Sequence, residues 1–155
     1  MPGIRRWHDQ DWLRAFVAMQ LEIAEHVGVA PAAIEIHPGS MPNEVDQILA
    51  GARALMDAFA ERYGQAPLIL LENRTGQVVS DGRDLLDVWR AAEAMGAEFV
   101  QQFGIVLDVQ QLFTQTKPTA PFMQHFGLIP DEALRAFHIH AKHRVPRMGD
   151  PIRIN

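Results

Sequence analysis

Three long stretches of the chain carry apolar residues at helical spacing. From Asp9 to Val27 and from Asn43 to Tyr63, these residues recur every three or four positions, as they do in a helix that buries one face. The stretch SDGRDLLDVWRAAEAMG predicts a third helix of the same kind. These stretches are flanked by residues that suit helix starts and helix ends: Asp9, Asp81, Gly28, Gly64 and Gly96.

Four short apolar runs alternate with helical segments and predict β-strands. The first is AAIEIHPG, closed by its proline and glycine, and the second runs from Pro67 to Glu72 in APLILLENRTG. The third is the whole of FGIVLDVQQLF, and the fourth is AFHIHAKH, with one or two helical turns expected before it at Asp131 to Arg135. Strands separated by helices pair in parallel, and the continuous runs LILL and GIVL suit strands that are covered on both faces. We therefore expect an α/β fold of parallel βα repeats, formed as one domain over residues 1–155.

Each predicted strand ends in a side chain that is able to bind a metal ion. These residues are His37, Glu72, Asp108 and His138, and about one strand-plus-helix unit separates each from the next. Because the carboxyl ends of parallel strands lie at one edge of a sheet, the four side chains are expected to gather there. Imidazole and carboxylate donors suit Zn or Mn, with Mg or Co as alternatives.

Taken singly, each of these residues also has a structural interpretation. His37 precedes a proline and suits a turn, Glu72 suits a solvated strand end, and Asp108 suits a cap for the following turn. His138 and His140 share one face of their strand by alternation, and either suits a hydrogen-bonded histidine in the core. The recurrence of donors at one level of the sheet favours a metal site, with His140 facing substrate or supporting a ligand.

The composition indicates the class of protein but does not indicate a reaction. The chain has 155 residues, 48% of them hydrophobic, with a net charge of -5 and no cysteine. This is typical of a globular domain, excludes disulfides and thiolate metal sites, and disfavours nucleic acid as a partner. No apolar run suits a membrane helix and no secretory signal is visible, so we expect a cytoplasmic protein without a membrane partner.

Several short motifs resemble those of the xylose-isomerase-like TIM-barrel superfamily. They are HPG at His37, then LLENRTGQ, VLDVQQLF and HIHAKH. The superfamily includes sugar isomerases and epimerases and the metal-dependent apurinic-site endonucleases. The resemblance runs from residue 34 to about residue 150 and implies that the four strand-end residues are successive metal ligands. It further implies that Glu72 binds or bridges metal and, in an isomerase, takes part in proton transfer.

Two departures from the family pattern bear on the activity. Gln111 stands where the endonucleases have a histidine that helps to hold a third metal ion, and their D.H pair is not visible in HRVPRMGDPI. A three-zinc phosphodiesterase site is therefore disfavoured. Four strands amount to half of a barrel that typically needs about 250 residues. We expect a partial barrel, either the C-terminal half of a longer ancestral one or a half that a homodimer completes.

These observations leave three functions open. The first is a divalent-metal-dependent isomerase or epimerase acting on a sugar or sugar phosphate, with Glu72 and His140 as catalytic residues. Gln111, Lys142 and Arg74 would contact the substrate, although Arg74 equally suits a surface arginine. The second is metal-dependent phosphodiester cleavage at abasic sites in DNA. The third is a non-catalytic half-barrel that binds a metal or another ligand.

Overall fold

The centre of the molecule is a parallel sheet of four strands. The computed structural model describes residues 5–116 and 121–139. In chain order the strands are β1 (Ala33–Ile36), β2 (Leu68–Glu72), β3 (Phe103–Asp108) and β4 (Leu134–His138), and each pairs in parallel with the next. The predicted α/β fold of parallel βα repeats is confirmed, and its four strands are consistent with part of a TIM barrel.

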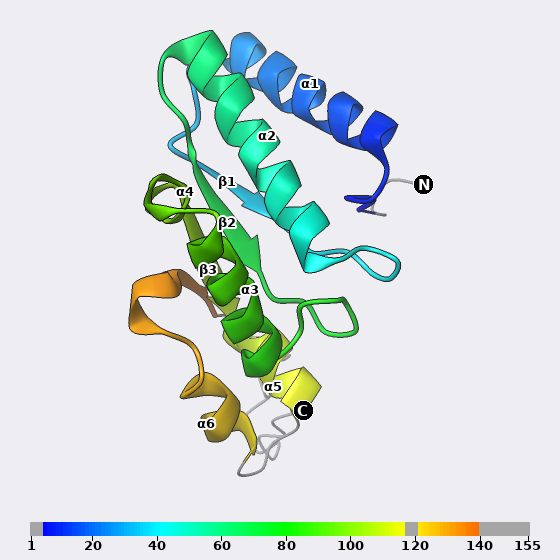
Figure 1. The fold of residues 1–155 in the computed structure, drawn as a ribbon, viewed down its shortest axis with the longest axis vertical. Helices are drawn as coiled ribbons and strands as arrows, with labels where there is room; N and C mark the ends of the chain where they lie inside the picture. The colour runs from blue at the N-terminus through cyan, green and yellow to red at the C-terminus, as the bar shows by residue number, and fades with distance from the viewer. Residues whose placement is uncertain (1–4, 117–120, 140–155) are drawn as a thin grey trace, which may run out of the picture.

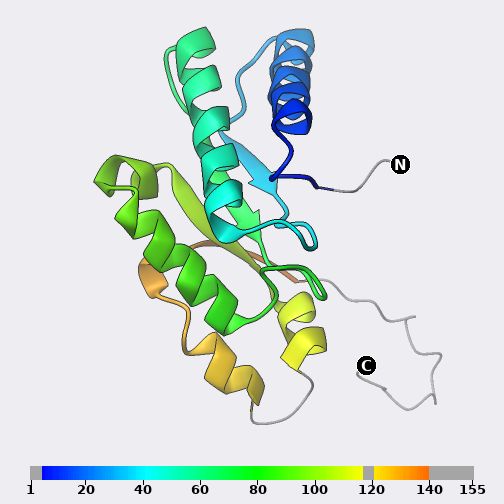
Figure 2. The ribbon, with the colours of Figure 1, turned by 45° about the vertical axis from the view of Figure 1, so that its right-hand side comes forward.

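Three long helices and several short ones precede or connect the strands. The long helices are α1 (Gln10–Val27), α2 (Val45–Tyr63) and α3 (Gly82–Ala94). Figures 1 and 2 show α2 and α3 against one face of the sheet and α1 beside α2. No helix among the described residues is long and apolar enough to cross a membrane. The shorter helical segments are α4 (Ala97–Gln101), α5 (Val109–Thr116), α6 (Pro121–Phe126) and the 3-10 turn η1 (Asp131–Ala133).

The ends of the long helices follow the sequence closely. The Asp9 carboxylate accepts hydrogen bonds from the backbone N–H groups of Asp11 and Trp12, and Gly28 ends α1 in the left-handed region at φ 82°. Helix α2 begins at Val45, two residues later than expected. The reason is that the buried Asn43 side chain donates hydrogen bonds to carbonyl oxygens of Arg5 and Ser40. Asn43 therefore belongs to the loop before the helix.

The third predicted strand is too long. The sequence predicts that VQQLF continues the strand, but these residues form the start of α5. Asp108 Oδ1 accepts hydrogen bonds from the backbone N–H groups of Gln110 and Gln111, at 2.9 and 3.0 Å, and so caps a helix at this point. The predicted turns at Asp131 to Arg135 shorten to η1, and α4 and α6 are not predicted.

The hydrophobic core lies between the sheet and the helices. Alternate residues of the strands point into it, among them Ile34 and Ile36 of β1. Helix α2 contributes Leu55 and Phe59, which are fully buried. The residues between these positions along each strand point to the opposite face of the sheet, and that face carries the candidate site.

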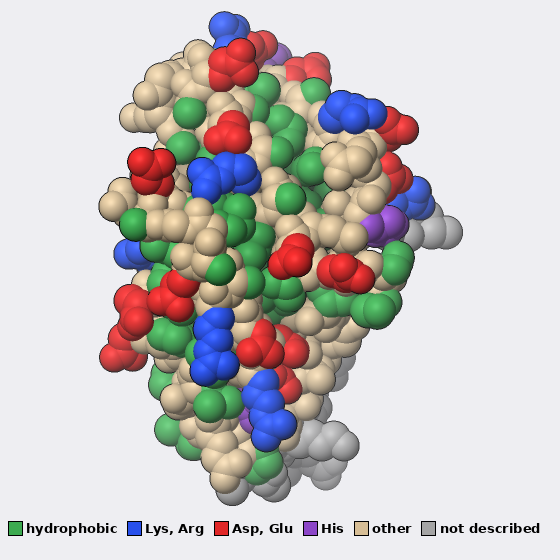
Figure 3. All heavy atoms as spheres, viewed as in Figure 1, with side chains coloured by type: hydrophobic (Ala, Val, Ile, Leu, Met, Phe, Trp, Pro, Cys, Tyr) green, Lys and Arg blue, Asp and Glu red, His purple; other side chains and the backbone are tan. Residues whose placement is uncertain are grey.

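Charged side chains of both signs are mixed over the described part of the helix-covered face. Lys and Arg side chains are interspersed with Asp and Glu over the side of the molecule seen in Figure 3. A groove that binds a nucleic-acid backbone collects basic side chains instead. The described side chains seen on this face therefore do not form a basic patch of that kind.

The role of Asp81 as the N-terminal cap of α3 can be tested by mutation. Asp81 Oδ1 accepts hydrogen bonds from the N–H groups of Arg83 and Asp84. Asp81→Ala is expected to lower the free energy of unfolding by about 1 kcal/mol, the usual contribution of such a cap. Urea denaturation would measure the loss, and Asp87→Ala on the exposed side of α3 is the control. A change within about 0.5 kcal/mol, as expected of a surface substitution, would contradict the capping role.

Candidate metal centre

The carboxyl ends of β2, β3 and β4 bring three metal-binding side chains together. Leu71 and Leu107 point into the core, so that Glu72 and Asp108, one residue further on, point to the opposite face. Asp108 is paired in register with His138. One donor atom each from Glu72, Asp108 and His138 lies within 4.8 Å of the others. Three of the four residues predicted from the strand ends therefore form one group.

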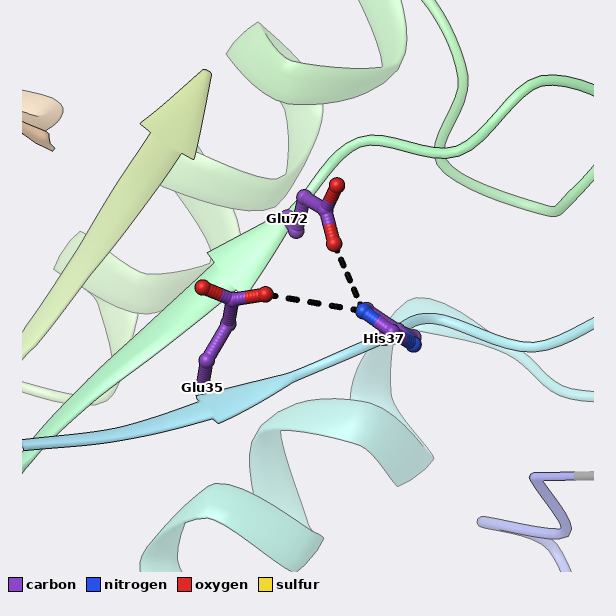
Figure 4. A group of neighbouring side chains, drawn as sticks. All are labelled: Glu35, His37 and Glu72. Atoms are coloured by element: carbon purple, nitrogen blue, oxygen red, sulfur yellow. Dashed lines mark ion pairs between the residues drawn. The ribbon is translucent and has the colours of Figure 1, made fainter. Parts of the chain in front are cut away.

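The fourth predicted residue, His37, meets the same carboxylate from the other side. Its Nε2 lies 2.6 Å from Oε2 of Glu72. Glu35, two residues earlier on β1, lies with its Oε1 3.6 Å from His37 Nε2. Figure 4 shows Glu35, His37 and Glu72 pointing toward one another from neighbouring strands. Donor atoms of these three residues also lie within 4.8 Å of one another.

The sheet is curved so strongly that side chains of its two outer strands, β1 and β4, meet at this edge. In a flat sheet, β1 and β4 would lie three strand spacings apart, or about 14 Å. Yet Oε2 of Glu35 on β1 lies 3.3 Å from Nε2 of His138 on β4. Two side chains of this length meet only when the outer strands curl toward each other, as they do in a barrel. Curvature is therefore what gathers all five donors.

Glu72 is the central member and is held in its ionised form. Its side chain is 2% exposed. Burial by itself raises the pKa of a carboxyl group, but hydrogen bonding to His37 and Asp108 outweighs burial and lowers the pKa of Glu72 to about 2. Arg74 adds a positive charge, because its Nη1 lies 3.4 and 3.5 Å from the two carboxylate oxygens. A buried carboxylate at this edge thus carries its negative charge at neutral pH.

The pKa of Glu35 is shifted upward, opposite to that of Glu72. Burial raises the pKa of Glu35, and its hydrogen bond with Glu72 and the negative charge of that residue raise it further. Three carboxylates at one edge repel each other unless protons or a cation intervene. A divalent ion bound by carboxylates and imidazoles removes that repulsion. The donor set therefore fits a metal ion of the kind expected from the sequence.

The motif residue Asn73 fastens the ends of β2 and β3 together. It is fully buried, and its Nδ2 donates to the Asp108 carbonyl at 3.2 Å while its Oδ1 accepts from the Asp108 N–H at 2.8 Å. An amide is the side chain that can donate and accept at once in this way. Asn73 thereby fixes the backbone from which the Asp108 carboxylate projects.

Two hydrogen bonds from residues distant in the sequence hold the loop after β1. Trp7 Nε1 donates to the His37 carbonyl at 2.9 Å, and Gln77 Oε1 accepts from the Gly39 N–H at 2.7 Å. Gly39 has a φ of 73°, and a Cβ atom at this position would overlap the side chain of Asn43. The HPG motif therefore requires its glycine for both space and backbone conformation. These contacts hold His37 in place at the end of the strand.

The predicted substrate-binding residues have different surroundings. Gln111 Oε1 accepts from the Thr75 N–H at 3.0 Å, so the side chain binds the loop that follows β2. Arg74 contacts Glu72, as described above, with a side chain that is 36% exposed. His140 and Lys142 lie outside the described residues.

Glu35 is the member of this group that the strand-end pattern does not predict. It lies within a strand rather than at the end of one, so the rule based on strand ends passes over it. The signal that could have found it is the period of two: residues 35 and 37 share one face of β1. Its approach to His138 depends on the curvature of the sheet, which the sequence does not display.

No model of a known protein family matches the chain. A comparison with curated proteins does find similarity. The probable endonuclease 4 of Nitratidesulfovibrio vulgaris (strain Hildenborough) is 30% identical over 102 residues. The matched region covers 64% of this chain and 36% of that protein, so the chain spans little more than a third of its relative. At this identity and coverage, the similarity supports a relationship at the level of the xylose-isomerase-like superfamily.

Proposed function

We propose that this chain is a divalent-metal-dependent enzyme whose metal ion is held by His37, Glu72, Asp108 and His138. The observation that carries the proposal is the buried, ionised Glu72 with donors from β1, β3 and β4 around it. Zn or Mn suits a mixed set of imidazoles and carboxylates best, and Mg or Co remains an alternative. A bound ion would act as a Lewis acid that polarises an oxygen atom of the substrate.

The reaction that this site suits best is isomerisation or epimerisation of a sugar or sugar phosphate. Glu72 would accept a proton from the carbon next to a carbonyl group of the substrate. His140 and Lys142 are proposed to serve as a second proton-transfer group and as a contact for hydroxyl or phosphate oxygens. Gln111 and Arg74 would border the substrate next to Glu72. The engagement of Gln111 with Thr75 supports this reaction over one that needs a third ion.

A second candidate is metal-dependent cleavage of a phosphodiester bond. The similarity to a probable endonuclease 4 favours it. In this case the same four residues would hold the ion, which would supply an activated water as nucleophile and stabilise negative charge on the phosphate oxygens. The net charge of -5 favours the first candidate.

One experiment with parallel arms separates these reactions. The protein loaded with Mn²⁺ or Zn²⁺ is incubated in D₂O with a panel of aldoses, ketoses and their phosphates, and proton exchange at the carbon next to the carbonyl is followed by NMR. Exchange that EDTA abolishes is the expected result. Nicking of an abasic oligonucleotide without sugar exchange would replace the first function by the second. Bound metal with neither activity would favour the non-catalytic alternative.

We further propose that a second copy of the chain completes the barrel. Among the described residues, β1 and β4 are the edges of the sheet, and unpaired edge strands favour association. Exposed apolar side chains lie near both edges, including Val27 and Val29 before β1 and Phe137 on β4. Size exclusion with light scattering is expected to give twice the chain mass of 17.4 kDa. A monomer at micromolar concentration would contradict this proposal.

A further inference from the structure

A cavity at the carboxyl edge of the sheet is lined by basic side chains. Its volume is about 450 Å³, within the range of about 300–1,000 Å³ that is usual for small-ligand sites. Its walls come from the segment before α1, the loop after β1 and the loop after β2. The lining residues are Arg5, Arg6, His8, Gly39, Ser40, Met41, Pro42 and Gln77. None of these residues is acidic, although the chain carries a net charge of -5, so the cavity favours an anion.

The two arginines of this cavity have few competing partners. Among the described residues, Arg5 forms no ion pair, and its guanidinium carbon lies 6.0 Å from the centre of the Phe16 ring. Arg6 Nη1 lies 4.0 Å from Asp9 Oδ2, and 52% of the Arg6 side chain is exposed. An exposed pair at this distance contributes little. Both guanidinium groups can therefore bind a ligand, and their paired N–H groups suit the oxygens of a phosphate.

The segment that carries these arginines is fixed to the loop that carries His37. Trp7 is fully buried, and its Nε1 donates to the His37 carbonyl at 2.9 Å. Asn43 Nδ2 donates to the Arg5 carbonyl at 2.8 Å. The loop packs so closely here that a Cβ atom on Gly39 would lie 2.8 Å from the Arg5 Cβ. These contacts fix the wall of the cavity before a ligand arrives, which lowers the cost of binding.

The Asn43 amide also sets the orientation of the His8 ring. Because Asn43 Nδ2 donates to the carbonyl oxygens of Arg5 and Ser40, Oδ1 is the atom that faces His8. This oxygen accepts from the His8 backbone N–H at 3.3 Å and lies 2.8 Å from His8 Nδ1. An oxygen acceptor at that position requires that Nδ1 carries a proton. The other ring nitrogen, Nε2, then remains for contact with a ligand, to which it can donate when the imidazole is protonated.

The cavity and the candidate metal centre share two loops. Gly39 lies two residues after His37, and Gln77 lies five residues after Glu72. Consecutive Cα atoms are about 3.8 Å apart, so the Cα atoms of Gly39 and His37 are separated by at most about 7.6 Å. A sugar phosphate carries its carbonyl and phosphate groups at opposite ends. One such molecule can therefore extend from the metal centre to the cavity.

We propose that this cavity binds the phosphate group of a sugar-phosphate substrate, with Arg5 and Arg6 contacting the phosphate oxygens and Ser40 adding a hydroxyl donor. This inference rests on the proposed function, because it places the carbonyl end of the same molecule at the metal ion. Two guanidinium groups match the two negative charges of a phosphate monoester. The substrate class is thereby narrowed from sugars and sugar phosphates to the phosphates.

The first test measures phosphate binding in the absence of metal. Inorganic phosphate is titrated in EDTA into the wild type, Arg5→Gln/Arg6→Gln and Arg83→Gln/Arg90→Gln, and phosphorus NMR follows its binding. Arg83 and Arg90 are exposed on α3, so the control removes the same charge from another surface. The affinity is expected to fall more than about 10-fold in the first variant and to stay unchanged in the control. Equal affinities, or no binding by the wild type, would overturn the phosphate site and leave the metal site untouched.

The second test identifies the molecule that carries the phosphate. With Mn²⁺ bound, proton exchange is compared for ribose 5-phosphate and for ribose. Arg5→Gln/Arg6→Gln is expected to raise the KM for the phosphate more than about 10-fold and to leave the KM for ribose unchanged. Binding of an abasic oligonucleotide that depends on both arginines, without binding of the sugar phosphate, would overturn the substrate class.

Failure of the proposed function has a separate signature. Phosphate binding in EDTA without proton exchange in any sugar would overturn the proposed reaction and support the anion site. Circular dichroism establishes that each variant is folded. Arg6→Gln alone provides a variant at an exposed side chain, and it is expected to weaken phosphate binding in the same direction as the double variant.

Discussion

Replacing Glu72 with glutamine is expected to weaken metal binding by more than about 100-fold. Mutating a residue that only orients a metal ligand typically lowers metal affinity by about 10- to 100-fold, and Glu72 is itself a proposed ligand. Glu72 belongs to both donor groups, so that its loss affects every ion the cluster could hold. Glutamine keeps the size of the side chain and one carbonyl oxygen but removes the negative charge. Titration calorimetry with Mn²⁺, on the wild type and the variant in parallel, measures the change in affinity.

Thermal unfolding gives a second measure of the same effect. An ion that binds only the folded chain stabilises it by about 2.7 kcal/mol at a concentration 100 times its dissociation constant. Added Mn²⁺ is therefore expected to raise the Tm of the wild type and of the control Glu61→Gln, whose substituted residue is exposed on α2, and to raise that of Glu72→Gln far less. Equal stabilisation of the wild type and Glu72→Gln would contradict the central position of Glu72.

The strand-end donors could be predicted because their placement follows from local rules. Parallel strands connected by helices must end at the same edge, and an apolar run shows where each strand ends. Glu72, Asp108 and His138 follow such runs and meet as expected. His37 follows one as well, and its contact with Glu72 agrees with the parallel pairing of β1 and β2.

The remaining features depend on three-dimensional relations that the sequence does not display. Glu35 joins the cluster because the sheet curls, and curvature is a property of the whole set of strands. The strand that was expected to include VQQLF ends early because Asp108 caps α5, and an apolar run alone cannot separate a strand from the helix that follows it. Gln111 turns toward Thr75, a contact between residues 36 positions apart.

A motif that resembles a family pattern does not by itself show the role of each of its residues. In LLENRTGQ, Glu72 belongs to the cluster, whereas Asn73 and Gln77 bind backbone atoms of neighbouring strands and loops. The motif thus combines one candidate ligand with residues that position others. This division leads to a prediction that concerns stability rather than chemistry.

Asn73→Ala is expected to lower the free energy of unfolding by about 2 to 4 kcal/mol. The substitution removes two hydrogen bonds to buried backbone groups of Asp108, and each such loss costs about 1–3 kcal/mol. The side chain is fully buried, so water cannot readily replace it. Urea denaturation in EDTA measures the effect without a contribution from metal. The loss of the link between β2 and β3 is also expected to weaken metal binding, because the Asp108 carboxylate is no longer held in place.

Gln77→Ala is the comparison for this prediction, since it removes one hydrogen bond, to the partly buried Gly39 N–H. Its expected cost is about 1 kcal/mol, the net contribution of a single hydrogen bond. Equal losses in both variants, or a loss within about 0.5 kcal/mol for Asn73→Ala, would contradict the role assigned to Asn73. A larger loss for Asn73→Ala, together with weaker Mn²⁺ binding, would establish that the alignment of β2 and β3 and the position of the Asp108 ligand depend on the same side chain.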